Sequence, residues 1–216
     1  MVVVESLDEK NEKPILFSPP MVQAIWDDRK TKTRRVAKIS FLPGFNPDWT
    51  GYKPILENGK FFLEGSNHKQ ATTEVKIPYQ VGDILWVRET WCNINKDGIA
   101  PEYYYLADCL RPWVEDYSPA DWKWKPSIHM PRIAARLFLK VKDIRVERLQ
   151  NITGWDVLAE GVDNGRSNPT MGERWENMQR LAFQDLWDNL YSKRGYGWDL
   201  NPWVWVIEFE RMNDPK

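Results

Sequence analysis

The stretch Asp28-Arg29-Lys30-Thr31-Lys32-Thr33-Arg34-Arg35 is the most informative part of this chain. Five of the seven residues from Arg29 to Arg35 are Lys or Arg, although the formal net charge of the whole 216-residue chain is only -1. Positive charge is therefore concentrated at one place, and two threonine hydroxyls are interleaved with it. This mixture is typical of a site that holds an anionic or nucleotide-like ligand, or that activates a hydroxyl nucleophile.

The residues on either side of the stretch predict a helix followed by a strand. Residues 21–26 have the pattern of a short amphipathic helix, and Pro19 and Pro20 stand at its start, where proline is tolerated. Residues 31–36 alternate as a strand does. Thr31, Thr33 and Arg35 then share one face, and Lys32 and Arg34 share the other.

Further strands and helices follow along the chain. The pair Asn58-Gly59 predicts a hairpin turn. Thr153 is expected to cap a short helix that Gly161 ends. The longest helix should bury the stripe Met178, Ala182, Leu186 and Leu190, flanked by Trp175, Phe183 and Trp187. We expect strands at residues 84–91, 103–105, 136–149 and 203–209, with a phase slip near 142–143, and helices at 155–161 and 173–191.

This order of elements predicts an α+β fold. The strands do not alternate regularly with helices, so a small closed β-barrel with peripheral helices suits the chain better than a doubly wound sheet. We expect a flexible N-terminal arm at residues 1–13 and one domain at residues 14–211. Long insertions are expected at about residues 41–78 and 111–131, which are rich in Pro, Gly, Asn or Trp.

Composition limits the class of protein. Apolar runs are too short for a membrane helix, and the N-terminus lacks the pattern of a signal peptide, so we expect a cytoplasmic protein that does not bind membranes. Cys92 and Cys109, the only cysteines, are then expected to be reduced. His68 and His129 have no further ligand at metal-binding spacing, so neither a metal nor another cofactor is expected.

The chain contains 13 tryptophans, which is the unusual feature of its composition. Most should pack in the core, as large aromatic side chains do. The run Trp122-Lys123-Trp124-Lys125 differs, because basic residues between aromatic rings favour contact with nucleic-acid bases.

Several motifs in their order resemble the ASCH domain, a family of the PUA-like superfamily. Its Gly-x-Lys-x-x-x-x-Arg signature is matched by Lys30 and Arg35, with Asp28 in place of Gly. The resemblance spans about residues 14–211 and includes longer phage and prophage members. Further matches are residues 81–87 (a Gly-Asp strand entry), 159–161 (Ala-Glu-Gly), 124–132, and 201–209, which contain the final strand.

The resemblance implies a PUA-like β-barrel with a cleft suited to RNA or modified nucleosides. One bacterial branch is an amidohydrolase that removes the acetyl group from N4-acetylcytidine with a Lys, a Thr three residues later and a Glu in a later helix. By motif these are Lys30, Thr33 and Glu160. Thr33 would be the nucleophile, Lys30 the base if burial or neighbouring cations lower its pKa, and Glu160 the supporting acid/base. Arg35 could hold the carbonyl oxygen as negative charge develops there.

Two other functions remain open at this point. The protein could be a non-catalytic module that binds RNA or a modified base, in which the basic run grips phosphate and an aromatic ring stacks on the base. It could also be a metal-independent ribonuclease using Tyr105, Lys30 and Ser127. The candidate substrate-binding residues are Arg35, Arg88, Trp91, Tyr105, Trp124, Ser127, His129 and Arg132; the substrate and the oligomeric state stay open.

Overall fold

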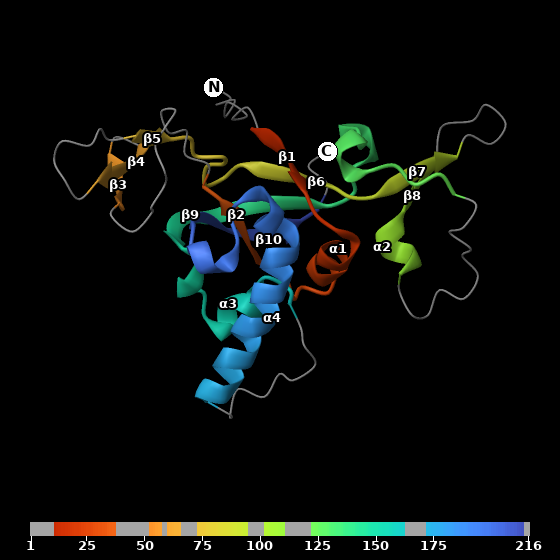
Figure 1. Ribbon diagram of the computed structural model, residues 1–216. Helices are drawn as coiled ribbons and strands as arrows, with labels where there is room; N and C mark the ends of the chain where they lie inside the picture. The colour runs from red at the N-terminus through yellow and green to blue at the C-terminus, as the bar shows by residue number, and fades with distance from the viewer. Residues whose placement is uncertain are drawn as a thin grey trace, which may run out of the picture. The chain divides into compact units, whose positions relative to one another are not determined.

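A computed structural model describes residues 11–37, 52–57, 60–65, 73–94, 102–110, 122–162 and 172–213. Its four α-helices and ten strands confirm the α+β class (Figure 1). The helices are α1 (Pro19–Trp26), α2 (Leu106–Cys109), α3 (Gly154–Ala159) and α4 (Glu173–Tyr191). The strands are β1 (Glu12–Leu16), β2 (Lys32–Val36), β3 (Tyr52–Glu57), β4 (Lys60–Gly65), β5 (Thr73–Val75), β6 (Ile84–Arg88), β7 (Trp91–Ile94), β8 (Glu102–Tyr105), β9 (Phe138–Arg148) and β10 (Trp203–Met212).

The strands form three sheets. The largest has the order β1-β6-β9-β10-β2, with β1 parallel to β6 and with β6–β9 and β10–β2 antiparallel. The other two are β3-β4-β5 and β7-β8. The described strands form open sheets and no closed barrel.

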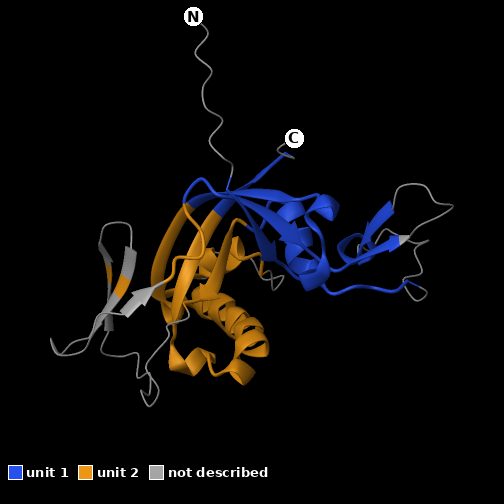
Figure 2. Ribbon diagram, turned by 90° about the horizontal axis from the view of Figure 1, so that it is seen from above, with its two compact units in different colours: residues 1–30, 81–142, 209–216 blue, residues 31–80, 143–208 orange. Residues whose placement is uncertain are grey.

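Contacts divide the chain into two compact units, shown in different colours in Figure 2. The first contains residues 1–30, 81–142 and 209–216, and the second contains residues 31–80 and 143–208. The long strand β9 crosses this boundary between Lys142 and Asp143, where the sequence predicted a slip in its alternation.

Most predicted elements are found close to their expected limits. The hairpin is confirmed by the antiparallel register of Glu57 with Lys60. Two of the predictions differ clearly from the structure. Glu12 and Lys13, expected in a flexible arm, are the first residues of β1, and the strand expected at residues 84–91 is divided into β6 and β7.

The buried face of α4 was predicted wrongly. The buried residues are Trp175, Gln179, Phe183 and Trp187, so the core stripe is offset from the expected one. Leu190, expected at the end of that stripe, is 42% exposed. Large aromatic rings bury more apolar surface than leucine or methionine, and this gain turns the aromatic face of the helix inward.

Each unit has its own apolar cluster. In the second unit, α3 and α4 lie side by side (Figure 1) and pack with β10. The members of this cluster are Leu149, Ile152, Val157, Phe183, Trp187, Trp198, Val204 and Val206. In the first unit, Trp91, Met130 and Ala134 form a smaller cluster with Tyr103 and Tyr105.

Candidate functional site

Strand β2 and helix α3 meet where the chain of the second unit begins. The backbone N–H of Thr31 donates to the carbonyl of Ala159 at 2.8 Å, which joins the entry of β2 to the end of α3. Thr153 starts α3 with a capping box that includes Asp156, as predicted for this N-cap. Gly161 follows the helix with a φ of 78°, a conformation that glycine adopts without strain. These local signals fix the position of α3 against β2.

The guanidinium of Arg34 is the centre of a buried group of charges. Its side chain is 0% exposed and lies against three carboxylates. Nη2 donates to Glu147 at 2.6 Å and lies 3.3 Å from Asp156, while Nη1 donates to Glu160 at 3.4 Å. Together with Lys32, whose Nζ lies 3.0 Å from Oδ1 of Asp156, these residues form what we call the Arg34 cluster.

The Arg34 cluster favours the ionised form of Asp156. Burial of Asp156 opposes ionisation, but the hydrogen bond from Lys32 and the charge of Arg34 outweigh it and lower the pKa of Asp156. The cluster therefore holds two acceptors one helical turn apart, Asp156 in the first turn of α3 and Glu160 at its C-cap.

Lys30, Thr33 and Glu160, the three predicted catalytic residues, are all buried. Their exposed fractions are 2%, 2% and 5%, and they are among only seven polar or charged residues that are buried in the described chain. Lys30 lies at the end of the first unit, with its Nζ 5.5 Å from the centroid of the Phe17 ring. Thr33 and Glu160 belong to the second unit.

Thr33 and Arg34 lie on opposite faces of β2. They pair with Ile207 and Val206 of β10, and neighbouring strand residues alternate in direction. Glu160 accepts from Nη1 of Arg34, whose side chain lies on the face of β2 opposite that of Thr33.

The basic run is largely neutralised by neighbouring acids. Arg29 pairs with Asp27 at 3.0 Å, and Lys32 and Arg34 pair with acids of α3. A grip on phosphate needs cations that are available to the ligand. The pairing therefore removes much of the support for the run as a phosphate-binding patch.

Asp28, which replaces the glycine of the resembled signature, has a φ of 56°. This left-handed conformation favours glycine, and Asp and Asn are the residues that tolerate it best among the others. Both Nε and Nη2 of Arg211 donate to Oδ1 of Asp28, at 3.3 and 3.1 Å. Asp28 thus adopts the same left-handed turn conformation that a glycine would adopt at this position.

Most of the predicted substrate-binding residues lie in the first unit and are engaged there. Trp91 is only 5% exposed, and Nζ of Lys125 lies 4.7 Å from its ring centroid. Arg88 donates to the carbonyl of Ile128, and Arg132 donates to Glu12 at 2.6 Å. Ser127 and His129 are the first and last residues of one 3₁₀ turn. The ring of Trp124 packs against that of Trp122, with centroids 5.5 Å apart. Arg35 differs from the others, because it lies on β2 in the second unit.

Tyr105 belongs to a second group of charges that the sequence did not indicate. Its hydroxyl donates to the carbonyl of Ala134 at 2.7 Å, and Arg136 lies 3.8 Å above its ring. Burial raises the pKa of Tyr105 to about 12. Arg136 also binds Glu89 and Asp108, at 2.9 and 2.6 Å, and burial raises the pKa of Glu89. A tyrosine held in this way is a poor base or nucleophile at neutral pH, which argues against the ribonuclease assignment.

Sequence reasoning missed Arg34, Asp156 and Glu147 as members of the site. The sequence placed Arg34 only in the basic run, on one strand face with Lys32. A signal was present, because Asp156 and Glu160 are four residues apart on one helix and Lys32 and Arg34 share one strand face. The acidic face of the helix and the basic face of the strand carry opposite charges, which indicates that these two faces can pack together.

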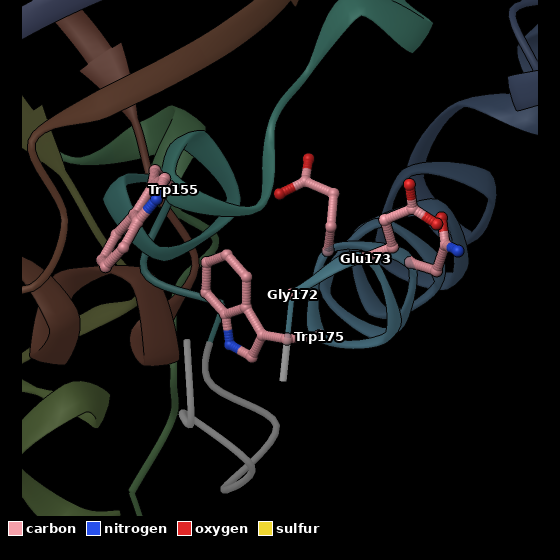
Figure 3. A pocket seen from close by; sticks show the side chains of 6 residues that line it. Trp155, Gly172, Glu173 and Trp175 are labelled. Carbon is pink, nitrogen blue, oxygen red and sulfur yellow. The ribbon is translucent and has the colours of Figure 1, made fainter. Parts of the chain in front are cut away.

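A separate pocket of about 440 Å³ lies between α3 and the first turns of α4 (Figure 3). None of the predicted catalytic residues lines it. The described residues contain no cluster of His, Cys, Asp and Glu that could hold a metal ion, and no described helix is long and apolar enough to span a membrane.

Comparisons with family models, with curated proteins and with solved structures found no match for this chain.

Proposed function

We propose that the protein is a hydrolase that removes the acyl group from an N-acylated cytidine-type base or nucleoside. The observation that supports this proposal is the burial of Lys30, Thr33 and Glu160, the three residues that the resembled motif indicates. Burying polar groups costs free energy, so a chain that keeps them buried has a structural or functional reason to do so. The proposal includes a PUA-like fold of the ASCH type, for which the left-handed Asp28 is further support.

The proposed chemistry is an acyl transfer in two steps. Oγ1 of Thr33 attacks the acyl carbonyl, and its proton passes to the amine of Lys30. The C–N bond then breaks, and the proton on Lys30 is given to the leaving amine of the base. Water then attacks the acyl-threonine ester while Lys30 accepts its proton, the C–Oγ1 bond breaks, and Lys30 returns the proton to Oγ1 of Thr33 as the carboxylic acid leaves.

The remaining charges have supporting roles in this proposal. Glu160 would orient the Lys30 amine or the substrate, and Arg34 keeps the carboxylate of Glu160 in place. Arg35, which shares a strand face with Thr33, is the candidate to hold the carbonyl oxygen. Burial disfavours the charged form of an amine, and a lysine needs this effect on its pKa to act as a base. Lys30 meets this condition, because it is only 2% exposed.

Turnover of N4-acetylcytidine tests the proposal. Purified protein should release cytidine and acetate in a time-dependent way, measured by chromatography. Lys30→Met removes the amine at similar volume and is expected to lower the rate by at least about 100-fold, the usual contribution of general acid–base catalysis. A wild-type rate equal to that of Lys30→Met would exclude this substrate.

A second candidate function, binding of single-stranded RNA, is favoured by one surface feature of the first unit. The rings of Tyr104, Trp122 and Trp124 form a row, with centroid separations of 4.5 and 5.5 Å. Lys123 and Lys125 are exposed beside it. Aromatic rows flanked by cations stack on bases and hold phosphates.

A binding assay separates the two functions. If the protein is only a binding module, RNA affinity should fall in Trp124→Ala, persist in Thr33→Ala and weaken with salt, with no turnover of acetylcytidine.

A further inference from the structure

The pocket between α3 and α4 has two aromatic walls. Figure 3 shows Trp155 projecting from α3 and Trp175 from α4, both in the second unit. Their ring centroids are 5.1 Å apart and their planes meet at 55°, so the two indoles form a corner. Trp175 is 3% exposed, whereas Trp155 is 61% exposed and offers an open ring face.

Two carboxylates complete the pocket. Glu173 and Glu176 stand in the first turn of α4, and the pocket is lined by Trp155, Gly172, Glu173, Trp175, Glu176 and Asn177. Oε1 of Glu176 accepts a hydrogen bond from the backbone of Gly154 at 2.7 Å, which fixes this carboxylate against α3. A Cβ at position 154 would lie 2.7 Å from Glu176 and from Trp175, so glycine is needed for this close packing.

The net charge of the pocket decides the sign of its ligand. The N-terminus of a helix carries about half a positive charge, which on its own favours anions. Glu173 and Glu176 place a charge of about −2 in the same turn, which outweighs the positive end of the helix dipole. Arg174, the cation of this turn, is not among the described residues that line the pocket. An anion is therefore repelled and a cation is favoured.

We infer that this pocket binds a guanidinium group. A guanidinium is planar and stacks on an indole face, and its forked N–H donors match a carboxylate. Trp155 supplies the face, and Glu173 and Glu176 supply the acceptors. A volume of about 440 Å³ is within the range of small-ligand sites and exceeds what the group itself fills.

This inference does not depend on the hydrolase proposal, because the pocket shares no residue with Lys30, Thr33 or Glu160. Either can fail while the other holds.

Titration calorimetry of the full-length protein with N-acetyl-arginine methylamide tests the inference. The neutral isostere N-acetyl-citrulline methylamide is the matched probe, and tetramethylammonium tests a cation without N–H donors. We expect the arginine compound to bind at least about 10-fold more tightly than either, the size of one lost charge-assisted contact. Equal affinity for arginine and citrulline compounds would overturn the inference, as would tighter binding of tetramethylammonium.

Agmatine distinguishes the source of the group. If agmatine binds as tightly as the arginine compound or more tightly, the natural ligand is a small free guanidine. If agmatine binds more weakly, the natural ligand is an arginine side chain in a peptide. Both outcomes support a guanidinium site. Binding of neither compound at millimolar concentration would overturn it.

Two variants locate the binding. Trp155→Ala and Glu173→Gln change exposed side chains, so both proteins should fold, which circular dichroism checks. Each is expected to weaken binding of the arginine compound by about 5-fold or more. Glu210→Gln, an exposed acid of the first unit, is the control and should bind as the wild type does. Unchanged affinity in both pocket variants would show that the arginine compound binds elsewhere and would overturn the assignment.

Discussion

Arg34 donates from Nη1 to Oε1 of Glu160 at 3.4 Å and joins β2 to the end of α3, across 126 positions of sequence. The same guanidinium binds Glu147 at 2.6 Å. Because its side chain is 0% exposed, the cation has been removed from water and depends on these acids for compensation. Arg34 therefore controls both the position of Glu160 and the stability of the second unit.

Replacing Arg34 by methionine should destabilise the protein strongly. The substitution leaves Glu147, Asp156 and Glu160 without their common cation, and breaking a buried ion pair on one side costs about 3–5 kcal/mol. Urea unfolding measures the free energy of unfolding. Arg29→Met is the control, because its pair with Asp27 is about 43–44% exposed and should contribute less than about 1 kcal/mol. Equal losses in the two variants would show that the Arg34 cluster is not a specific anchor.

Asp156 should give the protein a stability that depends on pH. Its pKa is lowered from 3.8 in the folded state, so the folded chain holds this proton less tightly than the unfolded chain does. The resulting contribution is fully present above the unfolded value and is lost as the pH falls through the lower, folded pKa. Urea unfolding of wild type and Asp156→Asn should differ most at pH 7, by about 1–3 kcal/mol.

The difference between these two proteins should shrink as the pH is lowered below about 3.8. A constant difference between pH 7 and pH 2.5 would contradict ionic stabilisation by Lys32 and Arg34.

Asp28→Gly should leave stability nearly unchanged. Glycine removes the strain of a φ of 56°, about 1 kcal/mol, while the loss of the exposed ion pair with Arg211 costs less than about 1 kcal/mol. Asp28→Val should lose about 1–2 kcal/mol more than Asp28→Gly, because a β-branched residue is strained at positive φ. Thermal unfolding of both variants, with Arg211→Met to isolate the ion pair, checks this. Equal stability of the Gly and Val variants would rule out a left-handed residue 28.

Tyr105→Phe tests whether the second group of charges has a structural or a catalytic role. The variant loses the hydrogen bond to the Ala134 carbonyl and should be destabilised by about 1 kcal/mol. Cleavage of acetylcytidine should be unchanged. A loss of RNA cleavage in EDTA, with wild-type protein active, would instead support the ribonuclease function.

The elements that could be predicted have strong local signals. Thr153 and Gly161 mark the ends of α3, and the 19-residue α4 has the limits that the sequence predicted. The buried face of α4 could not be predicted in the same way. Both the stripe with Met178 and the one with Phe183 repeat at helical spacing, and only packing against β10 and α3 selects the aromatic one.

For the candidate site, the motif indicated residues that are buried but not their contacts. Lys30, Thr33 and Glu160 were indicated by the resemblance to the ASCH motif, and the structure shows that each is buried. Arg34 was undervalued because its acids come from β9 and α3, more than a hundred positions away. Such long-range pairing is decided by the fold, so spacing alone does not reveal it.

Mass spectrometry of protein quenched during turnover of N4-acetylcytidine tests the central claim most directly. Cleavage before aspartate leaves residues 28–47 in one peptide, so an acetyl group on Thr33 can be located by fragmentation. We expect this peptide to carry one acetyl group, assigned to Thr33, in the wild type and none in Thr33→Val, which should also lose turnover. Turnover without acetylation of Thr33, together with full activity of Thr33→Val, would contradict the account.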